Sequence, residues 1–168
     1  MSILEAAIGW IAPPCCIVCG IEGSALCATC TKEKIIPYGE RCYGCGVVSR
    51  GSRTCERCRA GAPRHVWVGA NYESAASNLV KVYKFKQLRP AAHSMAEIMA
   101  RTYAKYCGLH IVDYLVVPVP TASGRIRNRG FDHADYLAAK IAKILGFKKI
   151  NALARLGQSR QVGAERTV

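Results

Sequence analysis

The sequence predicts an α/β fold built on a parallel sheet, preceded by a small cysteine-rich module, and three observations support this division. Eight of the ten cysteines lie at positions 16–58. Residues 1–61 carry 7 Lys and Arg against 5 Asp and Glu, whereas residues 62–168 carry 17 against 6, so +11 of the net charge of +13 belongs to the second part. From residue 66 onward, apolar runs of strand length alternate with helical patterns, an order typical of α/β sheets. We therefore predict two domains, residues 1–61 and 62–168.

The first residues are predicted to form a short helix, residues 2–11, that packs its apolar side chains against the body. This stretch carries Glu5, has no basic segment before it and ends at Pro13 and Pro14, so it matches a secretory signal peptide poorly. No apolar run approaches the roughly 20 residues that a membrane-spanning helix needs. We therefore expect a cytoplasmic protein without a membrane span.

The cysteines form four C-x2-C pairs in two similar halves, residues 16–30 and 42–58. The second half repeats the first with an offset of 26 residues in its first pair and 28 in its second. In a C-x2-C turn both thiolates face one point while backbone N–H groups hydrogen-bond the sulfurs, and two such turns complete a tetrahedral zinc site. Gly20, Gly44 and Gly46 suit the tight turns. The pattern predicts two structural zinc ions, bound by Cys16, Cys19, Cys27, Cys30, Cys42, Cys45, Cys55 and Cys58.

Other uses of these cysteines fit the pattern less well. Disulfides need an oxidising compartment, a thioredoxin-like redox pair needs one C-x2-C at a helix start, and iron–sulfur clusters usually have other spacings. The spacing leaves sequential and interleaved zinc ligation both open, although the short connections within each half favour the sequential arrangement. Cys15 is an alternative to Cys16 by a shift of one residue. Cys107 is predicted to be a buried, inert thiol.

The basic domain is predicted to begin with a strand at residues 66–72 and two helices. Ser74 is expected to cap the first helix, which turns its apolar side chains inward and its lysines outward. The inward set is Leu79, Val82 and Tyr83, and the outward set is Lys81, Lys84 and Lys86. Pro90 is expected to open the second helix, and Gly108 to end it. Its predicted apolar stripe is Met95, Ile98, Met99, Tyr103 and Tyr106.

Two further strands and a third helix complete the predicted sheet. Residues 114–120 are almost continuously apolar, which is typical of a parallel strand buried on both faces. Asp132 is predicted to cap the next helix and Gly146 to end it, with a strand at residues 149–153 after it. The predicted buried stripe of this helix is Leu137, Ile141, Ile144 and Leu145. In such sheets ligands bind beyond the carboxyl ends of the strands.

The segment between residues 120 and 132 follows such a strand end, and it is strongly basic. Arg125, Arg127 and Arg129 alternate there, so in an extended loop they would share one side. A solvated basic loop is the simpler interpretation. The position after a buried strand and before a helix N-terminus favours an anion-binding site instead.

A series of motifs then points to a family. APPCCIVCG, LCATC, CYGCG, CERC, VVPVP, RNRGFDHADYLA and ARLGQSRQVGAER resemble, in this order, the ComF family of phosphoribosyltransferase-like proteins associated with DNA uptake. The resemblance runs from about residue 10 to residue 166. It implies a double zinc ribbon followed by a Rossmann-like sheet of the type I phosphoribosyltransferase kind. It also implies a role with incoming single-stranded DNA and raises ribose-phosphate transfer as an activity.

The resemblance also assigns roles to residues. It implies a pyrophosphate-binding loop made of Thr121, Ser123, Gly124, Arg125, Arg127, Arg129 and Gly130. Asp132 departs from the family's usual Asn, and we prefer for it the role of helix cap. Gln161, Gly163 and Arg166 resemble the part of the family that forms a flexible flap. Type I enzymes also carry an acidic pair and a Thr/Gly-rich turn, which the family places after Arg166. The sequence has neither, so we expect an incomplete domain that lacks transfer activity.

The sequence is compatible with three functions. The one we favour is a binding module for single-stranded DNA or phosphate ligands, in which Lys81, Lys84, Lys86, Arg125, Arg127 and Arg129 contact phosphates. Trp67, Tyr72, Tyr83 and Phe131 are its candidate stacking residues. The second is an active phosphoribosyltransferase that uses phosphoribosyl pyrophosphate and Mg²⁺, if the protein continues past residue 168. The third is an adaptor, held together by zinc, that docks partners such as DNA-uptake proteins.

Overall fold

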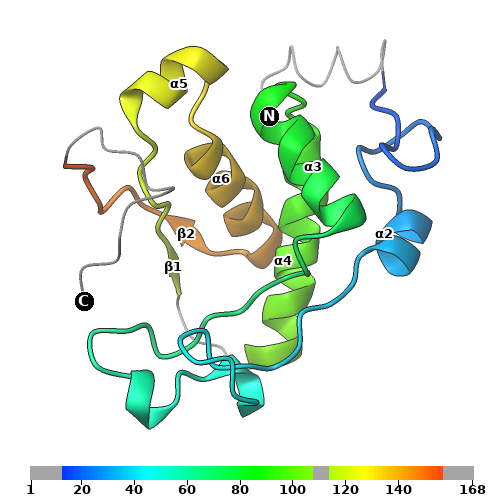
Figure 1. Ribbon diagram of the computed structural model, residues 1–168. Helices are drawn as coiled ribbons and strands as arrows, with labels where there is room; N and C mark the ends of the chain where they lie inside the picture. Colours follow the sequence, from blue (N-terminus) through cyan, green and yellow to red (C-terminus); the bar gives the residue numbers. More distant parts are fainter. Residues whose placement is uncertain (1–12, 108–113, 157–168) are drawn as a thin grey trace.

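The computed structural model describes residues 13–107 and 114–156, which form a group of packed helices beside a small sheet (Figure 1). The predicted helix at residues 2–11, the predicted helix end at Gly108 and the predicted flap with Gln161, Gly163 and Arg166 lie outside the described residues. The helices and strands in chain order are α2 (Ala28–Lys34), the 3₁₀ helices η1 (Arg50–Ser52) and η2 (Glu56–Cys58), α3 (Ser74–Phe85), α4 (Ala91–Cys107), β1 (Leu115–Val116), α5 (Ser123–Arg129), α6 (His133–Leu145) and β2 (Lys148–Lys149). None of the described helices combines the length and the apolar composition that crossing a bilayer requires.

The sheet consists of two short parallel strands. β1 pairs with β2 in the register Leu115 to Lys148 and Val116 to Lys149, and the N–H of Ile150 donates to the carbonyl of Val116 at 3.1 Å. The chain is therefore a mixture of helices and strands with parallel pairing, as the sequence predicts at this coarse level. Both strands are shorter than predicted. In the first, Pro118 and Pro120 have no N–H with which to continue a ladder.

Two predictions about strands are wrong. Residues 114–120 are not buried on both faces, because Tyr114, Leu115 and Val119 are 42%, 54% and 66% exposed. Residues 66–72 form no strand. They cross the structure as an extended connection, in which the N–H of Asn71 donates to the carbonyl of Ile36 at 2.9 Å.

Helix α3 shows the predicted inward face but a different start. Leu79, Val82 and Tyr83 are buried, as predicted. The residue in the N-cap position is Glu73 and not Ser74, and its side chain makes no capping hydrogen bond. The helix depends on its buried face for stability more than on a cap at this end.

The packing of α4 and α6 depends on small side chains. α4 packs more extensively against α6 than against any other described element. The buried residues are mostly alanines: Ala91, Ala92, Ala96 and Ala100 on α4, and Ala138 and Ala142 on α6. Two members of the predicted stripes, Met99 and Ile144, are exposed. Large apolar residues at helical spacing predict these stripes. The two helices approach each other closely through small side chains instead, so some of the large residues lie outside their contact.

The ends of α6 agree with the prediction. The carboxylate of Asp132 accepts hydrogen bonds from the N–H groups of Ala134 at 2.9 Å and Asp135 at 3.2 Å. Gly146 ends the helix in the left-handed conformation, with φ of 71°. The assigned role of Asp132 as a helix cap is therefore confirmed.

One hydrophobic core joins the first cysteine half to the helices. Cys16, Leu26 and Ile35 belong to the same buried cluster as Leu79 and Tyr83. The N–H of Leu26 also donates to Oγ of Ser94 on α4 at 3.3 Å. Among the described residues, no cysteine of the second half belongs to this cluster. The predicted boundary at residues 61–62 stays a prediction.

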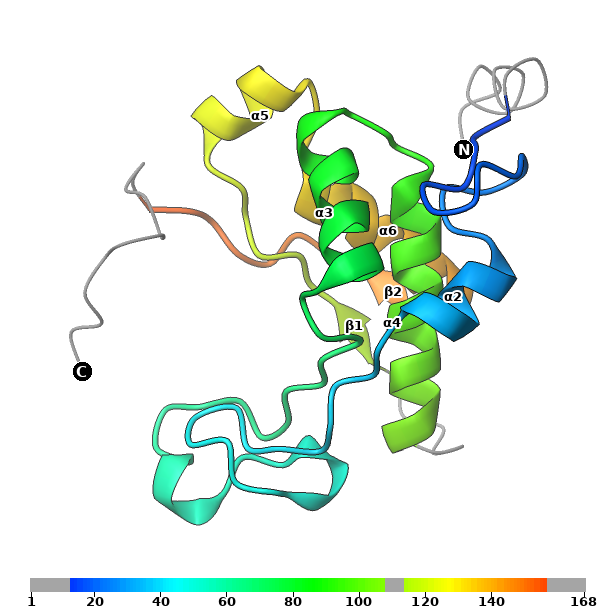
Figure 2. The same ribbon diagram turned by 45° about the vertical axis from the view of Figure 1, so that its right-hand side comes forward.

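The second half lies apart from this core. Both views place residues 42–58 below the helices, at the end of the structure opposite α5 (Figures 1 and 2). The two halves thus share a sequence pattern but occupy different environments.

Candidate metal centres and anion-binding pocket

The eight predicted ligands form two separate quartets. Cys16, Cys19, Cys27 and Cys30 make one, and Cys42, Cys45, Cys55 and Cys58 make the other. Within each quartet the four sulfur atoms lie within 4.8 Å of one another. All ten cysteines lie in the described residues and all are free thiols. The thiols are therefore grouped in the sequential arrangement, and none of them forms a disulfide.

The spacing of the sulfurs suits zinc. Sγ of Cys19 lies 3.7 Å from Sγ of Cys27, and Sγ of Cys45 lies 3.6 Å from Sγ of Cys55. A tetrahedral ion with Zn–S bonds of about 2.3 Å separates its sulfurs by roughly 3.8 Å. Four thiolates at this separation are the donor set of a structural zinc site.

The repeat is visible in the backbone. The N–H of Cys16 donates to the carbonyl of Ile21, and that of Cys42 to the carbonyl of Val47, both at 2.8 Å. The N–H groups of Gly20 and Gly46 close the turns on the carbonyls of Cys16 and Cys42, both at 2.9 Å. Each half therefore folds as the same tight turn around its first two ligands.

In each quartet, the pKa of one thiol is lowered, which favours its ionisation. Burial raises the pKa of Cys16, but hydrogen bonds from backbone N–H groups outweigh this effect and lower the pKa to about 6. The N–H of Cys27 makes the largest of these contributions. The N–H groups of Cys55 and Cys45 likewise lower the pKa of Cys42 to about 6. Thiolate is the form that binds a metal ion. These N–H···S contacts are the ones expected in a zinc knuckle.

The last thiol of each quartet has a raised pKa instead. Burial, followed by hydrogen bonding to Cys27, raises the pKa of Cys30 to about 12. Hydrogen bonding to Cys55 and Cys45 raises the pKa of Cys58 to about 12. Four like charges this close repel, so full ionisation of a quartet requires a cation at its centre.

Gly44 has a different role from the one predicted. Its φ is not positive, so the turn does not require glycine there. A Cβ at this position would instead lie 3.0 Å from both Cβ and Sγ of Cys58. Position 44 corresponds to Val18 in the first half, which carries a side chain there.

The basic segment after β1 is a helix and not the predicted extended loop. α5 spans Ser123–Arg129, and Gly130 ends it with φ of 76°. Residues four apart share a face of a helix, whereas residues two apart do not. Arg125 and Arg129 therefore lie together and Arg127 lies on another side. Arg127 and Arg129 also occupy the last turn, where cations favour the helix dipole.

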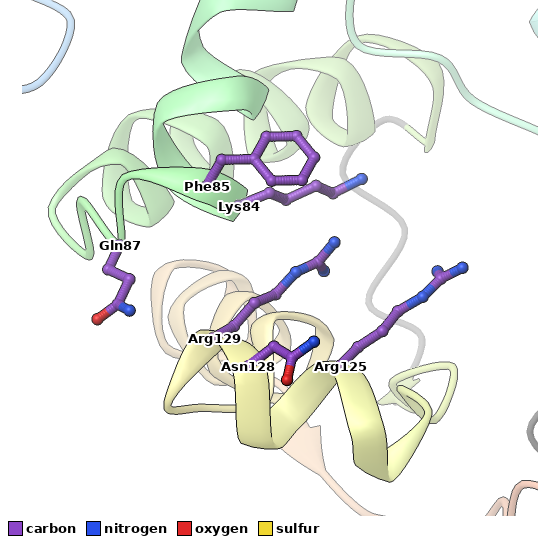
Figure 3. Close-up of a pocket in the computed structure, with 6 residues that line it drawn as sticks. All are labelled: Lys84, Phe85, Gln87, Arg125, Asn128 and Arg129. Atoms are coloured by element: carbon purple, nitrogen blue, oxygen red, sulfur yellow. The ribbon is translucent and has the colours of Figure 1, made fainter.

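A pocket of about 260 Å³ lies between the C-terminal end of α3 and helix α5. Its lining residues are Lys84, Phe85, Gln87, Arg125, Asn128 and Arg129, none of which is acidic. Figure 3 shows the charged ends of Lys84, Arg125 and Arg129 extending toward the same side. Three cations on one side of a pocket are an arrangement that can hold an anion with several oxygen atoms, such as a phosphate.

An exposed aromatic ring belongs to this pocket. Phe85 is 71% exposed, and Cζ of Arg129 lies 5.4 Å from the centre of its ring. Sequence reasoning missed Phe85, Gln87 and Asn128. Phe85 lies between Lys84 and Lys86 in the sequence. An aromatic residue between two lysines is the feature from which its place in a basic pocket could have been predicted.

Other residues predicted to bind anions lie elsewhere or are already engaged. The hydroxyl of Thr121 donates to Oδ1 of Asp132 at 2.8 Å. Lys81, Lys86 and Arg127 are exposed but do not line the pocket. Ser123, Gly124 and Gly130 belong to α5 and its C-cap without lining it. Among the predicted stacking residues, Tyr83 is buried.

Comparisons of the chain with protein-family models, with curated proteins and with solved structures gave no match.

Proposed function

We propose that this chain binds single-stranded DNA through its phosphates at the pocket between α3 and α5, with two zinc ions as structural elements. The observation that carries the proposal is that Lys84, Arg125 and Arg129, which come from two different helices, line one pocket and extend their charged ends toward the same side. A single strand presents a row of such anionic groups, and its neutralisation by lysine and arginine supplies most of the affinity in non-specific binding.

The surroundings of the pocket support the same function. Residues 62–168 hold most of the positive charge, so a polyanion is attracted to this part of the protein before it reaches the pocket. The resemblance of the motif series to the ComF family suggests incoming DNA as the source of the strand. The zinc ions, bound by eight thiolates, would hold the tight turns of the two cysteine halves in place.

The test measures binding of the full chain to a fluorescent oligothymidine over a range of salt concentrations. The R125Q/R129Q variant should bind more weakly, and each lost phosphate contact should lower the log–log salt slope by about 0.7. R127Q is the matched control for the single variant R125Q, since it removes an equal charge from another side of the same helix. If R127Q lowers the slope as much as R125Q does, the pocket is not the binding site.

A further inference from the structure

We infer that Phe85 stacks on a base of the bound strand, so that the pocket recognises a nucleotide unit and not a phosphate alone. This inference rests on the proposed function and specifies its ligand. A site for inorganic phosphate or pyrophosphate needs only cations and hydrogen-bond donors. The Phe85 ring adds a flat apolar surface that those ligands cannot use.

The environment of Phe85 supports a stacking role. Phe85 is 71% exposed although it belongs to the same helix as the buried Leu79 and Tyr83. The guanidinium of Arg129 lies over it at 5.4 Å, which orients the ring and leaves most of its surface open. Stacking on aromatic side chains tolerates any base, because every base has a π-face.

The remaining lining residues and the pocket's size fit one nucleotide. Lys84, Arg125 and Arg129 provide positive charge for its phosphate, while Asn128 offers a side-chain amide that can both donate and accept hydrogen bonds to a base edge. Gln87 also lines the pocket, but its amide extends away from these side chains (Figure 3). The volume of about 260 Å³ lies just below the range of about 300–1,000 Å³ for pockets that enclose drug-sized ligands. One base with its phosphate fits, and the rest of the strand must continue over the surface.

The experiment compares two strands of equal length and charge, an oligothymidine and an abasic oligonucleotide that keeps every phosphate. The wild-type chain should bind the oligothymidine at least about fivefold more tightly, the lower bound for one stacked base. In F85L this preference should be lost, while the affinity for the abasic strand and the salt slope stay unchanged. F85Y should keep the preference. Y72L is the control, because Tyr72 is 65% exposed and does not line the pocket.

F85W gives a direct readout, since a base stacked on the indole should quench its fluorescence when oligothymidine is added and the abasic strand should not. The outcomes separate the two proposals. Equal wild-type affinity for the two strands, or a preference that survives in F85L, overturns the stacking inference and leaves phosphate binding standing. Absence of binding to either strand overturns both.

Discussion

Tyr83 and His133 are joined by a reciprocal pair of hydrogen-bonding contacts between α3 and α6. The phenol hydroxyl of Tyr83 donates to the carbonyl of His133 at 2.7 Å, and Nε2 of His133 lies 3.0 Å from the carbonyl of Tyr83. Both residues are buried. Lys84 and Phe85 follow Tyr83 directly, and Arg129 precedes His133 by four residues. This pair therefore supports the two sides of the basic pocket from within the core.

Replacing Tyr83 with Phe should lower the free energy of unfolding by about 1–3 kcal/mol, because the carbonyl of His133 loses a donor in a buried position. Urea unfolding monitored by circular dichroism measures this. Tyr72→Phe serves as the control, since Tyr72 is largely exposed and its hydroxyl can bond to water. An unchanged midpoint for Tyr83→Phe would show that the hydrogen bond contributes nothing to stability.

The imidazole of His133 should titrate below its ordinary value of 6.5, because burial lowers its pKa, although the carbonyls of Tyr83 and Phe131 oppose this effect. Because the pKa of His133 is lower in the folded than in the unfolded chain, the unfolded chain binds more protons than the folded chain as the pH falls. The contribution to stability is therefore full above about pH 6.5 and declines as the pH falls below it. NMR titration of the ring measures the pKa of His133, with the exposed His93 as reference signal. A pKa above 6.5 for His133 would contradict the prediction.

Protein purified without added metal should contain two zinc equivalents, one for each quartet. Cys16→Ser and Cys42→Ser should each lose one equivalent, with different effects on the rest of the chain. Cys16 shares the core with Leu79 and Tyr83, so its loss should destabilise α3, whereas loss of Cys42 should leave the helices folded. Metal analysis combined with amide hydrogen exchange of the helices measures both effects. Intact folding after complete chelation would argue against a structural role for the metal.

Gly44→Ala should weaken zinc binding at the second quartet by about tenfold or more, the usual effect of disturbing groups next to metal ligands. The added Cβ would meet Sγ of Cys58 at 3.0 Å. Gly39→Ala is the matched control, since its nearest side-chain contact would be an ordinary 3.8 Å from Arg41. Competition with a chromogenic chelator gives both affinities, and equal values for the two variants would mean that the site tolerates the methyl group.

Features set by local chemistry could be predicted from the sequence. The two quartets follow from the spacing of C-x2-C pairs, which constrains the thiolates within a few residues. The boundaries of α6 follow from Asp132 and Gly146, whose capping preferences are local as well. The parallel pairing of β1 and β2 agrees with the order of helices and strands along the chain.

Features that depend on tertiary packing could not be predicted in this way. Alternating arginines suggested an extended segment, because a helix of seven residues is too short to show its period in the sequence. The exposure of Met99 and Ile144 follows from the close packing of alanines elsewhere on their helices. Phe85 joins the basic pocket only because α5 returns to the end of α3, a long-range contact that no local pattern records.

The unequal surroundings of the two quartets have a consequence for metal exchange. The first quartet is attached to the helical core, so releasing its ion requires that part of the core to open. Among the described residues, no cysteine of the second quartet belongs to that core, so its ion should be released at a lower cost. The residence time of the ion should accordingly be longer in the first quartet. When zinc is scarce, the chain would then pass through a half-loaded form that retains its helices and its basic pocket and has lost order only at residues 42–58.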